Sequence, residues 1–116
     1  MARKPFKGII PSRFHVGGIE YEVKFVTNEY NNGNFGRIEY HTSKIKLQRE
    51  MSNVPISTNQ LTQTFWHEVV HGILDAMGEI EKNNNEQFVC CFSSILNEVI
   101  QSCEIDDNEH EKEEKI

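Results

Sequence analysis

The most constraining feature of the chain is the stretch from Asn59 to Met77, which carries two periodic patterns on one predicted helix. Its apolar residues recur at intervals of three or four, as in the buried stripe of an amphipathic helix. The stripe consists of Leu61, Phe65, Val69, Ile73, Ala76 and Met77. The opposite side of the helix carries Thr64, His67, Glu68, His71 and Asp75. Ser57, Thr58 or Asn59 is expected to cap the start of this helix, and Gly78 its end.

His67 and His71 lie four residues apart, so their side chains are stacked one turn apart on one face of the predicted helix. Two imidazoles in this arrangement can bind one metal ion. Glu68 follows the first histidine, where its carboxylate can accept a proton from water bound to the metal. The pattern therefore predicts a metal centre with His67 and His71 as ligands and Glu68 as the general base.

A catalytic zinc ion takes three protein ligands and keeps one position open for water. We choose Glu86 as the third ligand, because it opens a second predicted helix that can fold back antiparallel to the first. The other candidates for this position are Glu79, Glu81, Asp75, Cys90 and His110. Asp75 is better placed to accept a hydrogen bond from an imidazole N–H.

The residues before the helix alternate between apolar and polar side chains, a period typical of strands. We expect strands at residues 13–16, 19–26, 35–41 and 44–48, with Gly17 and Gly18 in a tight turn and a loop at residues 28–34. The inward-facing residues should be Ile19, Tyr21, Val23, Phe25, Ile45 and Leu47. Outward lysines at Lys44 and Lys46 favour an edge strand at residues 44–48.

The second helix is expected at residues 86–102, after a loop at residues 79–85 that ends in asparagines able to cap it. Its apolar stripe consists of Phe88, Phe92, Ile95, Leu96 and Val99. The fold class is therefore predicted to be α+β. An antiparallel sheet of about four strands should pack on the helix that carries the metal centre, with a second helix at the C-terminal end.

Length and composition indicate one domain at residues 13–103, between an irregular segment at residues 1–12 and an acidic, disordered tail at residues 104–116. The net charge of −6 argues against nucleic acid as a partner. No apolar run is long enough to cross a membrane, and we expect no signal peptide before residue 20. The three cysteines, two of them adjacent, imply no disulfide framework. We therefore expect a cytoplasmic protein.

The stretch from Thr64 to Asp75, with Glu86-Gln87-Phe88-Val89 after it, resembles the zincin metallopeptidases, and more closely their small glutamate-ligand branch. It is similar to the short metallopeptidase-like proteins of phages and integrative elements, relatives of the ImmA/IrrE-type peptidases. The resemblance implies that zinc is held by His67, His71 and Glu86, with Glu68 as the base. It also implies that an extended peptide is aligned along the edge strand before the helix, here residues 44–48.

The predicted function is that of an intracellular zinc peptidase acting on a peptide or protein substrate. Tyr40, His41 and Tyr30 are candidates for stabilising the transition state. The main alternative is a non-catalytic, zinc-stabilised or partner-binding module. Glu68 favours the enzyme, because a structural zinc site has no use for a base between its histidines. A regulatory binding protein without metal is the third hypothesis.

Overall fold

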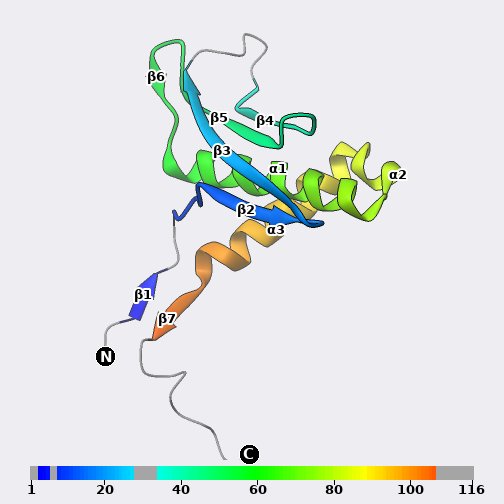
Figure 1. Ribbon diagram of the computed structural model, residues 1–116. Coiled ribbons are helices and arrows are strands. Elements are labelled where there is room, and N and C mark those ends of the chain that lie inside the picture. Colours follow the sequence, from blue (N-terminus) through cyan, green and yellow to red (C-terminus); the bar gives the residue numbers. More distant parts are fainter. Residues whose placement is uncertain (1–2, 6–7, 28–33, 107–116) are drawn as a thin grey trace, which may run out of the picture.

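The computed structural model of the protein describes residues 3–5, 8–27 and 34–106, which form an α+β domain. The larger sheet contains β2 (Arg13–Val16), β3 (Ile19–Thr27), β5 (Lys44–Met51) and β4 (Gly36–Glu39) in that spatial order, and β6 (Val54–Pro55) pairs with β5. The helices are α1 (Thr58–Met77), α2 (Ile80–Asn83) and α3 (Glu86–Ser102). As Figure 1 shows, this sheet lies on one side of α1 and α3 on the other. The predicted α+β class is confirmed.

The larger sheet is mixed, because β3 pairs with β5 in parallel, with Val23 beside Ile45 and Phe25 beside Leu47. Its other strand pairs are antiparallel. The prediction of an antiparallel sheet is therefore wrong at this one pair. After β3 the chain forms β4 at the far edge and then returns as β5 between the two. Alternation along a strand indicates which face is buried, but it carries no information on the partner strand or its direction.

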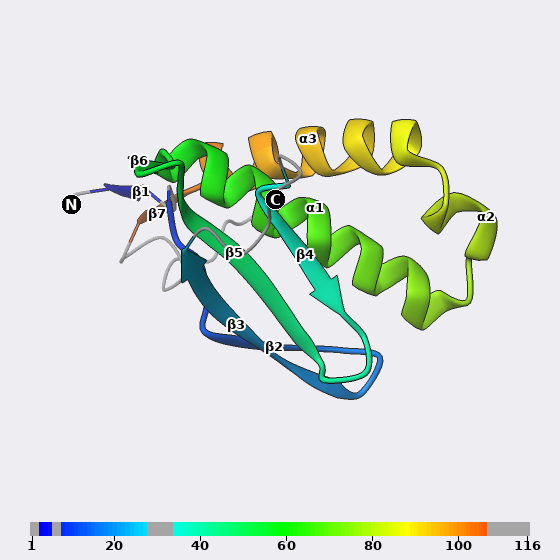
Figure 2. The ribbon, with the colours of Figure 1, turned by 90° about the horizontal axis from the view of Figure 1, so that it is seen from above.

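The edge strand beside α1 is β4, not residues 44–48 as predicted. Figure 2 shows β4 running along α1, while β5 lies between β3 and β4. Ile45 and Leu47 on β5 are fully buried. The lysines of β5 lie on its opposite face, where Lys46 pairs with Glu39 at 3.4 Å. Outward lysines therefore mark the outer face of this sheet and not its edge.

The close approach of β4 to α1 depends on two glycines. A Cβ on Gly36 of β4 would lie 2.6 Å from the carbonyl oxygen of Lys46 and 2.9 Å from Cγ2 of Thr64. A Cβ on Gly72 of α1 would lie 3.1 Å from Cδ1 of Ile38. The absence of side chains at both positions therefore allows the strand to lie directly over the polar face of α1.

The main core lies between the larger sheet and α1. Phe65 and Val69 of α1 pack there against Val23, Ile45 and Leu47. Tyr21 is buried as predicted. The prediction is wrong for Ile19 and Phe25, which are 49% and 40% exposed, because they lie toward the two ends of β3. Thr64 and Glu68, expected on the open side of the helix, are instead buried.

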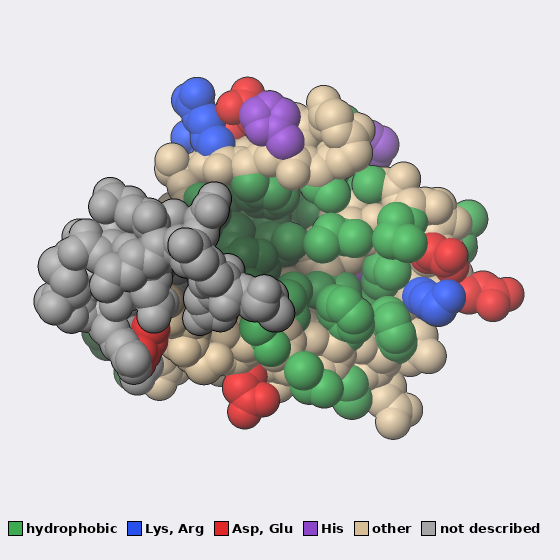
Figure 3. Space-filling view, turned by 90° about the horizontal axis from the view of Figure 1, so that it is seen from below, with side chains coloured by type: hydrophobic (Ala, Val, Ile, Leu, Met, Phe, Trp, Pro, Cys, Tyr) green, Lys and Arg blue, Asp and Glu red, His purple; other side chains and the backbone are tan. Residues whose placement is uncertain are grey.

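A second, smaller core joins α1 to α3. Val70 and Leu74 of α1 pack against Val89 of α3, which is fully buried. Ser93 is buried one turn further along α3. The predicted stripe of α3 is therefore wrong in part: Phe88 and Leu96 pack against this core, whereas other members are exposed. These exposed members are Phe92, Ile95 and Val99, and on α1 Met77 is exposed as well. Figure 3 shows hydrophobic side chains on this side of the molecule.

The helix ends follow the predicted capping residues. The Ser57 side chain accepts a hydrogen bond from the Gln60 backbone N–H at 3.2 Å. Gly78 ends α1 with a positive φ of 72°, a conformation that glycine adopts without strain. Asn85 caps α3 by accepting from the Phe88 N–H at 3.1 Å. The short helix α2 lies within residues 79–85, where only a loop was expected.

Two short strands, β1 (Arg3–Pro5) and β7 (Glu104–Asp106), pair antiparallel in a separate sheet. They lie within the two end segments that were expected to be irregular. Figure 1 shows this pair projecting from the body of the molecule. The rest of the predicted tail, with His110, and the loop that contains Tyr30 lie outside the described residues. Within the described part of the chain, no helix combines the length and the apolar character needed to cross a membrane.

Candidate metal centre

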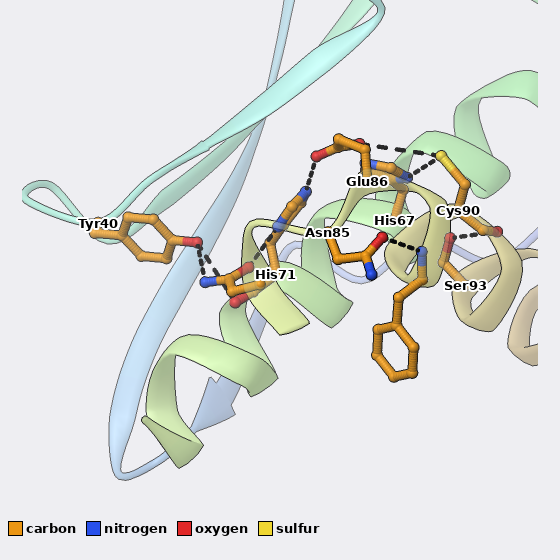
Figure 4. Close-up of polar contacts among 9 residues, drawn as sticks. Tyr40, His67, His71, Asn85, Glu86, Cys90 and Ser93 are labelled. Atoms are coloured by element: carbon orange, nitrogen blue, oxygen red, sulfur yellow. Dashed lines mark hydrogen bonds and ion pairs between the residues drawn. The ribbon is translucent and has the colours of Figure 1, made fainter. Parts of the chain in front are cut away.

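Three predicted ligands meet at one point between α1 and α3. His67 and His71 project from successive turns of α1, and Glu86 is the first residue of α3. One ligand atom from each of the three residues lies within 4.8 Å of the other two, and such a group can hold a metal ion. Figure 4 shows Glu86 reaching toward both histidines. The asparagine cap at Asn85 and the short helix α2 direct Glu86 back over α1.

The separations between these atoms suit a tetrahedral ion. Nε2 of His71 lies 3.1 Å from Oε1 of Glu86, and Nε2 of His67 lies 3.4 Å from Oε2. Ligand atoms about 2.1 Å from a tetrahedral zinc ion lie roughly 3.4 Å from one another. Both separations are close to this value, so one ion could contact the two imidazoles and the Glu86 carboxylate.

A chain of hydrogen bonds defines the tautomer of His71. The Tyr40 hydroxyl donates to the backbone carbonyl of His71 at 3.4 Å, since a carbonyl can only accept. The Asn83 amide N–H donates to the Tyr40 oxygen at 3.4 Å. The Asn83 Oδ1 atom therefore faces Nδ1 of His71, 2.6 Å away, and accepts a hydrogen bond from it. With its proton on Nδ1, a neutral His71 directs the lone pair of Nε2 at Glu86.

The electrostatics of this arrangement favour a cation between the three side chains. A nitrogen lone pair 3.1 Å from a carboxylate oxygen is repulsive unless a proton or a metal ion lies between them. Burial lowers the pKa of His67 below its ordinary value, and the neighbouring His71 adds to this effect against the opposing influence of Glu86. A neutral imidazole is the form that binds metal. The two imidazoles and the carboxylate are therefore a donor set that could hold a metal ion.

Cys90 is the neighbour of His67 on the side away from His71. Its Sγ atom lies 3.9 Å from Nδ1 of His67 and 4.0 Å from Oε2 of Glu86. Burial raises the pKa of the Cys90 thiol, and the Glu86 carboxylate raises it further. The sulfur is thus a weak neutral partner for the His67 N–H, with Nε2 of the same ring directed at Glu86.

Glu68 lies under β4 beside the three-residue group. Glu68 is buried, with only 8% of the residue exposed. Burial raises the pKa of Glu68 to about 7, although the His71 ring and a hydrogen bond with the backbone of Ile38 oppose the shift. A carboxyl group with such a pKa can accept and release a proton near neutral pH.

Two open clefts meet at Glu68. One has a volume of about 440 Å³, and its lining combines polar side chains such as Gln60 and Gln63 with Phe35, His67 and Glu68. The other has a volume of about 360 Å³ and is lined by residues that include Arg37 and Tyr40. Both are bounded by β4, so together they form a groove that follows the edge strand past the histidines.

The other predicted site residues lie outside the three-residue group. Asp75, which was expected to accept a hydrogen bond from an imidazole N–H, is exposed. The residue that accepts from His71 is instead Asn83. Glu79 pairs with Lys82 at 3.4 Å, Glu81 is exposed on α2, and His41 is exposed. Asn83, the first of three consecutive asparagines, was not among the predicted site residues. The one feature of the sequence that could have indicated its role is its position three residues before the predicted ligand Glu86.

The chain was compared with protein-family models, with curated proteins and with solved structures, and none of the three comparisons found a match. The fold and the site therefore stand on the geometry described above.

Proposed function

We propose that the protein is a small zinc-dependent peptidase with a zincin-like site. The observation that carries this proposal is the meeting of His67, His71 and Glu86 within 4.8 Å, next to the buried Glu68. A purely structural zinc site usually has four protein ligands, often cysteines, and has no use for a neighbouring base. Here three ligands and a base surround an accessible cleft.

His67, His71 and Glu86 would hold the zinc ion. When bound, zinc supplies Lewis acidity, which lowers the pKa of a water molecule and polarises a carbonyl group. Glu68 would accept the proton of the attacking water and pass it to the leaving nitrogen. Its pKa, raised to about 7 by burial, suits a group that must both take up and give back a proton.

The edge strand β4 would align the substrate. Arg37 and Glu39 pair across to β5, and the Phe35 carbonyl accepts from the Gln48 N–H. By alternation, the backbone groups of Gly36 and Ile38 face the groove. An extended peptide that pairs with them as an additional strand would pass over Glu68, with one part in each cleft.

Tyr40 is the candidate for holding the developing oxyanion. Burial raises the pKa of its hydroxyl, although the hydrogen bond with Asn83 opposes this shift. The phenol therefore keeps its proton at the rim of the 360 Å³ cleft, and it would turn that proton from the His71 carbonyl to the oxyanion.

The test compares wild type, Glu68→Gln and a control, Glu81→Gln, in which an exposed carboxylate is neutralised. Each protein is purified without added metal, its zinc content is measured, and it is incubated with a broad peptide library analysed by mass spectrometry. We expect all three to contain about one zinc ion. Wild type and Glu81→Gln should cleave peptides, and Glu68→Gln should not.

The outcomes separate the proposal from its alternatives. Wild type that binds zinc but cleaves no peptide of the library would support a non-catalytic zinc-stabilised module. Protein that contains no zinc and does not bind it when zinc is added would support a metal-free binding protein. Cleavage that persists in Glu68→Gln would exclude Glu68 as the base.

A further inference from the structure

Four apolar residues form a row along α3: Phe88, Phe92, Ile95 and Val99. Val89 and Ser93, which are buried against α1, lie about a third of a turn around the helix from this row. Three members of the row are half exposed or more: Phe92 at 50%, Ile95 at 63% and Val99 at 54%. Phe88 also packs against the core between α1 and α3. The row is therefore an apolar face of α3 that borders the buried face, with Phe92, Ile95 and Val99 exposed.

A hollow of about 250 Å³ lies beside the row, between α1 and α3. Its lining is almost entirely apolar and includes Val70, Ile73 and Met77 of α1 together with Phe88 and Phe92 of α3. Figure 3 shows hydrophobic side chains gathered on this side of the molecule. The face thus has both projecting apolar side chains and a recess that could receive them.

The size of this face suits a protein interface. Met77 and Ile80 extend it at 64% and 73% exposed. With the three exposed members of the row, they leave roughly 500 Å² of apolar surface in water, a patch size that usually marks a binding site. A standard interface buries about 800 Å² of surface on each partner. The hollow and its rim would supply the rest of this area.

The spacing of the row indicates the occupant. Its members are separated by four, three and four residues, the repeat by which one helix packs along another. The order of these separations is the same from either end of the helix. In an antiparallel pair of α3 helices related by a two-fold axis, Phe92 therefore faces Ile95 of the other copy, and Phe88 faces Val99.

Charge also favours a second copy. The only charged residues of α3 are Glu86 and Glu98. The charged residues that line the hollow, Glu79 and Lys82, pair with each other at 3.4 Å, so a charged partner would find little to pair with. In the antiparallel arrangement the two Glu98 residues lie roughly 13 Å apart along the axis, at a rise of about 1.5 Å per residue. Such a separation exceeds the screening length of about 8–10 Å in ordinary buffers, so their repulsion is weak.

We infer that the protein forms a two-fold dimer in which the Phe88, Phe92, Ile95 and Val99 rows of two α3 helices pack antiparallel. Exposed side chains of each row then lie over the hollow of the other copy. Glu86 and the groove along β4 lie away from this row, so the dimer leaves the metal centre open. This inference does not depend on the proposed peptidase activity.

The test measures molecular mass by sedimentation equilibrium from about 1 to 100 μM, the range of ordinary dimer affinities. We expect wild type to be dimeric, and Ile95→Glu to be monomeric with a dimer Kd raised by at least about 100-fold. The matched control is Gln87→Glu, which adds the same charge to an exposed position of α3 outside the row and should stay dimeric. Circular dichroism confirms that each variant is folded.

A mixing experiment tests the register. Phe92→Lys alone should also be monomeric. When it is mixed with Ile95→Glu, the new lysine faces the new glutamate while the unchanged Phe92 and Ile95 face each other, so a heterodimer should form. The antiparallel register is overturned if the mixture stays monomeric while wild type is a dimer.

Three other outcomes would overturn the inference as a whole. In the first, wild type is a monomer at about 100 μM and Ile95→Glu has an unchanged thermal midpoint, so nothing covers the face. In the second, wild type is a monomer and Ile95→Glu melts at a lower temperature, so another segment of the chain covers it. In the third, Ile95→Glu is dimeric with the affinity of wild type, so the dimer uses a different surface.

Discussion

The side-chain oxygen of Asn83 lies 2.6 Å from Nδ1 of His71, and this one contact links three separate parts of the chain. Asn83 belongs to α2 and His71 to α1, and the same amide group donates to Tyr40, which follows β4. The contact holds the imidazole in the tautomer and orientation that direct Nε2 toward Glu86.

Replacing Asn83 by alanine should weaken metal binding. Loss of the acceptor frees the His71 ring to rotate and to change tautomer, and outer partners of this kind typically contribute about 10- to 100-fold to metal affinity. Competition with a chromophoric zinc chelator measures the change. Asn83→Asp should restore most of the affinity, since its carboxylate also accepts. Asn84→Ala, an exposed neighbour, is the control and should bind as wild type does.

Cys90 makes the corresponding contact with His67, but through a weaker acceptor. Cys90→Ala should therefore lower zinc affinity by less than about 10-fold. Cys91→Ala removes the adjacent exposed thiol and should have no effect. A cobalt-substituted protein offers a second measurement: a sulfur-to-cobalt charge-transfer band that is lost in Cys90→Ala would show that Cys90 is a direct ligand, contrary to our expectation.

The buried Glu68 should make the metal-free protein less stable as the pH rises. Its folded-state pKa of about 7 lies above the ordinary value of 4.5. Between these values the unfolded chain releases a proton that the folded chain retains, so stability falls as the pH increases through this window. Above the window the penalty should be on the order of 3 kcal/mol.

Glu68→Gln should remove this penalty. Urea unfolding with chelator present, at pH 4.5 and pH 8, gives the difference between wild type and variant at each pH. The variant should gain stability relative to wild type at the higher pH, and groups such as His67 largely cancel in the comparison. Glu81→Gln, at an exposed position, should show no such trend. A difference independent of pH for Glu68→Gln would contradict the raised pKa.

Gly36→Ala should destabilise the fold by about 1–3 kcal/mol, because the new methyl group would collide with the backbone oxygen of Lys46. Gly72→Ala, on the facing helix, should cost much less. Its methyl meets only the end of the Ile38 side chain, and alanine is favoured over glycine in a helix by about 1 kcal/mol. Urea unfolding of the two variants tests the contrast, and equal losses would show that β4 and α1 approach less closely than described.

The elements that were predictable from the sequence are those defined by local signals. The period of α1, the glycine at Gly78 and the asparagine at Asn85 mark helix ends through nearest-neighbour chemistry, and the observed boundaries follow them closely. The parallel pairing of β3 with β5 was not predictable in this way. It depends on the path of the chain between strands, to which the alternating pattern is insensitive.

The same distinction applies to the candidate site. The spacing of His67 and His71 is a property of one helix, so their shared face could be predicted. Glu86 could be proposed because a helix that folds back over α1 carries it to the histidines. Asn83 and the burial of Glu68 depend on how α2 and β4 pack over α1. Such tertiary contacts leave no periodic mark in the sequence.

Glu86 comes from α3 and the two histidines come from α1. Metal binding at this site is therefore thermodynamically coupled to the packing of α3 against α1. A ligand at 100 times its Kd adds about 2.7 kcal/mol to the stability of the state that binds it. By reciprocity, any substitution that loosens Val89 from Val70 and Leu74 reduces the affinity for the ion, although it touches none of the ligands. Metal titration of this protein would therefore report on its helix packing.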